Sequence, residues 1–405
     1  NMEQFRKKTV HFASSDEGVK VAELITLVDN NPLAKEILKL LDVKSRMGEI
    51  IQIPGSRDLV KIQNAINQKY HKEDLESDLN SISLYSGEDF TINFNALEQN
   101  KYFVSLGTKQ INTVPIYSAT NDFFSELYQM EKYASKLIKD GYKDIVEANL
   151  RMLKGIQTLT KKFRILHDRE EDNFYLRAII SLSSYFNYDN NIAIVISLLA
   201  LHEEMKKYDI KYRLKVCEYN ESFISMFFES SKAKELQNIG YVRNLIEVSN
   251  DEIKREALKF NGVCYISFKD SNNIDNELFI IRPQEIKSRI LSIKHNVLPK
   301  TAIEELSHIS DAGNIHTSLF EDIATITQIK SPEQIKFLLK RKVESAKGDS
   351  IKRYKKQILD TLNESTSNII QLLTLFKKIE IIANEDIDAI EYIRYIVYQA
   401  LIDRK

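Results

Sequence analysis

The stretch IKYRLKVCEYNESFISMFFES (residues 210–230) decides the fold, because its apolar and polar side chains alternate largely with the two-residue period of a β-strand. We interpret it as two strands, 210–219 and 222–230. Two strand-like runs precede it, KFRILHD (162–168) and YLRAIIS (175–181), and two follow it, GYVRNLIEVSN (240–250) and GVCYISF (262–268). These runs predict that residues 161–268 form one compact unit built on a mainly antiparallel sheet.

A long apolar segment, NIAIVISLLALHEEMKKY (191–208), lies between the second and third of these strands. Asp189 and Asn190 stand directly before it, where short polar side chains cap the free N–H groups of a helix. The segment therefore predicts an amphipathic helix that packs across one face of the sheet.

The flanking regions differ from this centre. Short helical and strand-like runs alternate before it, whereas after the strand-like run ELFIIRP the pattern is helical. Ser331 and Pro332 suit the N-cap and first position of one such helix. The expected class is α+β, with a mixed N-terminal region (1–120), a central α+β domain (121–300) and an all-helical C-terminal region (301–405).

Composition restricts the class of protein. The 405 residues are 43% hydrophobic and 28% charged, with a net charge of −1, which is typical of soluble globular chains. No apolar run reaches the roughly 18 residues that span a bilayer, and the N-terminal segment has no signal-peptide pattern. We therefore expect a cytoplasmic protein without a membrane partner, in which Cys217 and Cys264 are buried, reduced side chains.

Catalytic motifs are missing from the sequence. It contains no GxxxxGK[ST] or GxGxxG phosphate loop and no GxSxG nucleophile elbow. His308 and His316 flank Asp311 and could converge on a metal, but two surface polar histidines are the far commoner reason for this spacing. We predict no catalytic residues, no metal site and no cofactor.

Basic side chains give a stronger indication of function. The alternation in 210–219 places Lys211, Arg213 and Lys215 on one strand face. The preceding strands add Lys161, Lys162, Arg164 and Arg177, with Tyr175, Tyr185 and Tyr188 available for stacking on bases. This pattern predicts a cationic stripe on one sheet face that could bind nucleic acid. The alternative is an exposed sheet face with ordinary solubilising charges.

A second basic cluster lies in the C-terminal region, in KFLLKRKVESAKGDSIKRYKKQ (336–357). Its candidate binding residues are Lys340, Arg341, Lys342, Lys352, Arg353, Lys355 and Lys356. Such density can neutralise several backbone phosphates. The alternative is a solvated helix face, since the same segment also carries an apolar stripe.

The central region resembles a family of uncharacterised phage/plasmid-like proteins. That family's pattern runs Arg-Ala-Phe/Ile-Leu-Ser, an aromatic residue, Asp-Asn before a helix, paired strands, and an Ile-Ser-Asn-Ser-Glu segment. The matching positions, within roughly residues 155–300, are Arg177, Ala178, Ser181, Asp189, Asn190, Ser249, Asn250 and Glu252. Lys254 replaces the family's glycine, and the Cys-Thr-Asn-Gly turn is absent around residues 268–271. The resemblance implies a role in a mobile element and assigns no catalytic residue.

These observations support two functional hypotheses. The first is a phage or plasmid protein that binds nucleic acid, single-stranded and without sequence preference, in recombination, replication or DNA protection. The second is an interaction protein whose helical C-terminal region forms a homo-oligomer or docks a protein partner, because IIQLLTLF and YIRYIVYQALI need an apolar surface to pack against. An enzyme, such as a nuclease with a degenerate site, is the third hypothesis.

Overall fold

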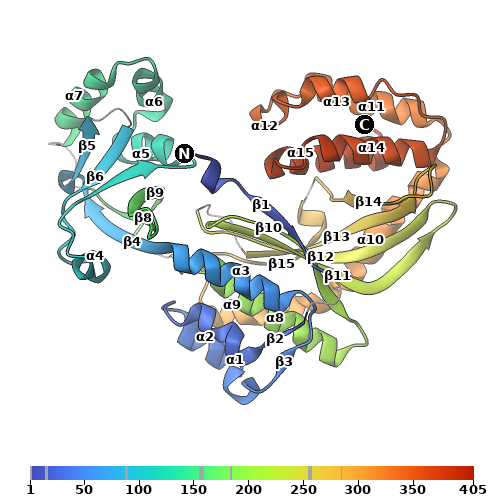
Figure 1. Cartoon of the computed structure of the whole chain (residues 1–405), viewed down its shortest axis with the longest axis horizontal. Coiled ribbons are helices and arrows are strands. Elements are labelled where there is room, and N and C mark those ends of the chain that lie inside the picture. The colour runs from blue at the N-terminus through green and yellow to red at the C-terminus, as the bar shows by residue number, and fades with distance from the viewer. Residues whose placement is uncertain are drawn as a thin grey trace. The chain divides into compact units, whose positions relative to one another are not determined.

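The computed structural model describes residues 2–13, 17–86, 90–154, 159–182, 185–253, 258–283 and 285–405, and it confirms the α+β class. The chain divides into two compact units, each assembled from separate segments (Figure 1). Unit 1 comprises Asn1–Gln4 and Lys61–Phe186, and unit 2 comprises Phe5–Val60 and Asn187–Lys405. The boundary at 186–187 falls inside the predicted central domain, 121–300.

Unit 1 is built on a six-stranded sheet with the order β4-β8-β9-β7-β6-β5, in which only β7 and β9 run parallel. Its strands are β4 (Tyr70–Asp78), β5 (Ile82–Ser86), β6 (Phe90–Phe94), β7 (Ile111–Pro115), β8 (Thr160–Asp168) and β9 (Asn173–Ile180). Its helices are α4 (Lys101–Ser105), α5 (Ala119–Tyr128), α6 (Glu131–Lys139) and α7 (Lys143–Lys154), while α3 (Ser56–Lys69) contains the boundary with unit 2. Phe94, Phe123 and Phe163 are fully buried in its core.

Unit 2 contains the larger sheet, in which every neighbouring pair of strands is antiparallel. The order is β1-β10-β11-β12-β13-β14, and β15 also pairs with β13. The strands are β1 (Lys8–His11), β10 (Tyr212–Tyr219), β11 (Phe223–Leu236), β12 (Gly240–Asp251), β13 (Leu258–Lys269), β14 (Asp275–Ile280) and β15 (Arg289–Ile293), and β2 (Val19–Lys20) pairs separately with β3 (Ile50–Ile51).

The two-residue period explains how this sheet is buried. Along β13, Val263 and Tyr265 join one apolar cluster, with Leu245 of β12. Cys264 and Ile266, which alternate with them, belong to a second cluster shared with the C-terminal helices. Strands that are covered on both faces carry apolar side chains at consecutive positions, as β13 does.

Helix α8 (Asn190–Lys207) begins as predicted, because the Asp189 carboxylate accepts the backbone N–H of Ile192 at 2.8 Å. The amphipathic prediction is wrong for its first three turns. Ile194, Ile196 and Leu198 point in different directions around the helix axis, yet all are 0% exposed. Polar, exposed side chains begin only in the last turns, so α8 is a core helix with a polar end.

The remaining helices of unit 2 are α1 (Val21–Leu24), α2 (Ala34–Leu40), α9 (Pro299–Glu305), α10 (Ala312–Ala324), α11 (Pro332–Ser345), α12 (Asp349–Lys352), α13 (Lys355–Thr361), α14 (Ile369–Ile382) and α15 (Ile387–Tyr398). Residues 300–405 are described without a gap and contain no strand, which confirms the predicted helical region. In Figure 1, α11 and α13 form an outer layer over α14 and α15. Ser331 precedes α11 without making a side-chain cap bond.

The prediction that residues 161–268 form a single unit is wrong. Strands β8 and β9 belong to the sheet of unit 1, whereas β10 to β13 belong to that of unit 2. The local period identified these strands correctly, but pairing is decided by partners far away in the sequence. Strand β8 pairs with β4, about 90 residues upstream, and β10 pairs with β1, about 200 residues upstream.

Candidate functional site

The predicted cationic stripe is divided between the two sheets. Strand β4, which the sequence did not reveal as a strand, is acidic and lies beside the basic strand β8. Glu76 stands opposite Lys162 and Asp74 opposite Arg164, and the side chains of each pair lie within 4.0 Å. Cross-strand pairs of opposite charge stabilise a sheet and remove its net potential. The structure therefore corrects the prediction of a stripe on one face.

Several side chains of unit 1 that were expected to contact nucleic acid are buried or paired within the fold. Arg164 and Arg177 are 1% and 2% exposed, and the Arg164 guanidinium covers the ring of Tyr185 at 4.3 Å. Lys161 lies 3.5 Å from Glu126 of α5. Tyr175 is also buried, so it cannot stack on a nucleic-acid base as expected.

The sheet of unit 2 shows the same neutralisation. Arg213 stands opposite Glu229 on β11, with Nη2 at 3.1 Å from the carboxylate. Lys215 lies 2.9 Å from Glu277 and 3.5 Å from Glu229, and its side chain is mostly buried. Lys211, just before β10, is exposed. Tyr188 is fully buried and donates to the carbonyl of Val297 at 2.8 Å.

The C-terminal basic cluster has a different environment. It lies on α11, α12 and α13, whose apolar side chains Leu339, Val343, Ile351 and Ile358 pack into the core of unit 2. Burying this stripe directs the intervening basic residues outwards. Arg341, Lys347, Lys352, Arg353 and Lys356 are exposed, and Lys340, Lys342 and Lys355 are half-buried.

Three of these lysines have structural partners. Lys355 donates to the carbonyls of Glu344 and Ala346, at the negative end of the α11 dipole. Lys340 donates to the side-chain oxygen of Asn363 at 3.2 Å. Lys352 pairs with Asp349 at 2.8 Å.

The other cations of the cluster have no acidic partner in the part of the chain that the structure describes. Among the described residues no ion pair involves Arg341, Lys342, Lys347, Arg353 or Lys356. We call these five residues the α11–α13 cationic surface. Beside it Phe337 is 57% exposed, and the guanidinium of Arg341, one helical turn further on, lies 6.0 Å from its ring. The surface thus combines unneutralised cations with an accessible aromatic ring.

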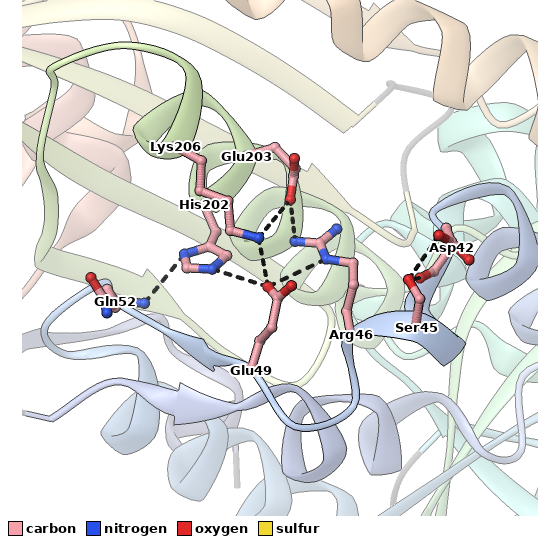
Figure 2. A network of polar contacts seen from close by, with 8 residues as sticks. All are labelled: Asp42, Ser45, Arg46, Glu49, Gln52, His202, Glu203 and Lys206. Atoms are coloured by element: carbon pink, nitrogen blue, oxygen red, sulfur yellow. Dashed lines mark hydrogen bonds and ion pairs between the residues drawn. The ribbon is translucent and has the colours of Figure 1, made fainter.

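A further polar network joins the end of α8 to the segment before β3 (Figure 2). Glu49 lies 2.7 Å from Lys206 and 3.4 Å from Nε2 of His202. Arg46 reaches Glu203 at 2.7 Å. These contacts connect side chains about 150 residues apart in the sequence.

His202 lies beside a carboxylate, as a catalytic histidine often does, but both of its ring nitrogens face groups of the protein itself. The backbone N–H of Gln52 donates to Nδ1 of His202 at 3.4 Å, so the proton resides on Nε2, facing Glu49. Burial, with Lys206 and Arg46 nearby, lowers the pKa of His202. Both ring nitrogens are occupied within the fold, and the network therefore clamps α8 to this segment.

No group of three or more metal-binding side chains gathers anywhere in the described ranges. His316 was expected at the surface, but it is buried, with Nε2 at 2.7 Å from the carbonyl oxygen of Leu245.

None of the helices in the described ranges is long and apolar enough to cross a membrane. Cys217 and Cys264 are free and buried, and burial raises the pKa of both thiols.

Comparison of the chain with known proteins yields no matching family model, no similar curated protein and no matching solved structure.

Proposed function

We propose that this protein binds nucleic acid through the α11–α13 cationic surface. It prefers single strands and does not distinguish between base sequences. One observation carries the proposal: its five cations have no acidic partner among the described residues, whereas most of the predicted sheet cations face acids. An unpaired surface cation keeps its counterions, and their release on contact with phosphate drives binding.

The binding mode follows from the side chains present. The lysines and arginines would contact phosphate oxygens, which carry no sequence information. Phe337 would stack on an unpaired base, an interaction worth about 1–3 kcal/mol per base. A duplex keeps its bases stacked on one another, so this contact favours single strands.

The first prediction tests the surface itself. Replacing Arg341, Lys342, Arg353 and Lys356 together with Gln should weaken binding of a labelled oligothymidylate and flatten its salt dependence. Each lost phosphate contact lowers the slope of log K against log salt by about 0.7 for single strands. Fluorescence anisotropy between about 50 and 200 mM salt measures both quantities.

The matched control removes four charges elsewhere in unit 2. Lys20, Lys35, Lys39 and Lys44 are exposed, and their replacement with Gln changes the net charge equally. This control should bind as the wild type does. Equal losses in both variants, or no wild-type binding near 50 mM salt, would overturn the proposal. Phe337→Ala should weaken single-strand binding and leave duplex binding unchanged.

The second hypothesis was an interaction protein whose C-terminal helices need a partner to cover their apolar side chains. These apolar side chains are buried inside unit 2, so they do not require an external partner. Examples are Leu373, Phe376, Ile393 and Val397. Recombination, replication or DNA protection in a phage or plasmid is the setting that the family resemblance implies, and the binding test does not depend on it.

A further inference from the structure

A polar hollow of about 120 Å³ lies in unit 2, beside the sheet and the first turns of α15. Strands β10, β12 and β13 contribute Glu218, Glu247 and Asn261, and α15 contributes Glu391 and Arg394. The hollow is separate from the α11–α13 cationic surface, and none of its lining residues belongs to that surface.

The basic side chains that line the hollow already have acidic partners. Arg394 lies between Glu218 at 3.3 Å and Glu380 at 3.1 Å. Lys7 pairs with Asp388 at 3.0 Å, and Lys259 pairs with Glu285 at 3.0 Å. Arg282 is held from outside the hollow by Asp322, at 2.9 Å. Among the described residues that line the hollow, no cation is therefore left without an acidic partner for a negatively charged ligand.

Two of the carboxylates differ from the rest. Glu247 accepts the hydroxyl of Ser225 at 2.9 Å, and Glu391 accepts that of Tyr395 at 2.8 Å. Neither forms an ion pair with any residue that the structure describes. Glu247 is half-buried, whereas Glu391 is exposed. A half-buried carboxylate such as that of Glu247 is costly without a cation, because it has lost part of its hydration.

An independent observation also points to a ligand. Ser288 lines the hollow and is 3% exposed, and its hydroxyl has no hydrogen-bond partner among the described residues. Buried hydroxyls are satisfied in nearly all proteins, by protein atoms or by a bound molecule. A ligand N–H group can donate to this oxygen as well as to the two carboxylates.

We infer that the hollow binds a small organic ammonium ion, held by Glu247 and Glu391 and hydrogen-bonded to Ser288. No cluster of three metal-binding side chains exists among the described residues, which favours an organic cation over a metal ion. A cavity of roughly 150 Å³ accommodates benzene, so the part enclosed here has about six non-hydrogen atoms or fewer.

Three probes of similar size separate charge from shape: n-butylammonium, its isostere butan-1-ol, and butyrate. Titration calorimetry on the full chain should detect saturable binding of the ammonium compound at least about tenfold tighter than the alcohol, and no binding of butyrate. Equal affinities for the amine and the alcohol, or tighter binding of butyrate, would overturn the inference.

The pH dependence gives a second readout. Burial raises the pKa of Glu247 to about 7, with Glu218 and Glu391 raising it further and Ser225 and Arg394 opposing them. Because the ammonium ion needs the ionised carboxylate, its affinity should rise about tenfold from pH 6 to pH 8. A flat profile would contradict the role of Glu247.

Variants locate the site. Glu247→Gln and Glu391→Gln should each lower the affinity for n-butylammonium at least about tenfold at pH 8. Gln at 247 can still accept from Ser225, so the fold is retained, and thermal unfolding checks this directly. Glu235→Gln, at an exposed position of β11 outside the hollow, is the matched control and should bind as the wild type does. Unchanged affinity in both hollow variants would show that the amine binds elsewhere.

Discussion

At the scale of single residues, charge partners decide what a side chain can do. Arg213 and Arg341 are the same residue type in predicted binding patches, yet Arg213 faces Glu229 across a strand pair and Arg341 faces no acid among the described residues. The sequence shows where the basic residues cluster, but their partners come from other parts of the chain. The sequence therefore could not show whether the cationic stripe was neutralised, because its acids come from β4, β11, β14 and α5.

Glu247 gives a prediction at this scale, and its sign follows from linkage. Its pKa in the folded protein is about 7, above its usual value of 4.5, so the folded state holds the proton more tightly. Its contribution to stability is therefore lost as pH rises from 4.5 to 7. Glu247→Gln should unfold like the wild type below pH 4.5, and should gain up to about 3 kcal/mol in the free energy of unfolding above pH 7.

Urea denaturation from pH 4 to pH 8 measures this gain, with Glu235→Gln as a control that leaves the pH profile unchanged. A Glu247→Gln variant that is less stable than the wild type at pH 8 would contradict this account of the site.

At the scale of secondary-structure elements, local patterns identify helices and strands more readily than their surroundings. The cap at Asp189 and the apolar run after it predict α8 closely, because both signals lie within the element. Its burial on all sides depends on what packs against it. Strand β4 was missed because its YHKEDLESD sequence carries charges instead of β-branched side chains.

Helix α8 provides a test of this distinction. The side chains of Ile194 and Ile196 point to different sides of the helix. In an amphipathic helix one of the two would face solvent, and its replacement with Ala would be tolerated. Both side chains are fully buried here, so each change should lower the free energy of unfolding by about 2–5 kcal/mol. Lys207→Ala, at an exposed position of the same helix, should have little effect, and urea unfolding compares all three. A tolerated change at either isoleucine would restore the amphipathic interpretation.

At the scale of the whole molecule, the α+β class could be predicted from the sequence, whereas the division into two units could not. Unit 2 takes in residues 5–60 as well as everything after residue 186, and the main segment of unit 1, Lys61–Phe186, is inserted between these two segments. Such an insertion leaves no signal in hydrophobic period or composition. It is decided by strand pairing over long separations, as in β1 with β10.

Because each unit has its own apolar core, damage to one core should remain within that unit. Phe163→Ala removes a fully buried ring from unit 1, and Phe228→Ala does the same in unit 2, each at a cost of about 3–5 kcal/mol. Hydrogen exchange reports opening segment by segment, since locally cooperative regions exchange independently. Phe163→Ala should accelerate exchange in β4, β8 and β9 and leave β11 to β13 protected, and Phe228→Ala should give the converse. If either variant accelerates exchange equally in both sheets, the two units unfold as one cooperative body and their cores are not independent.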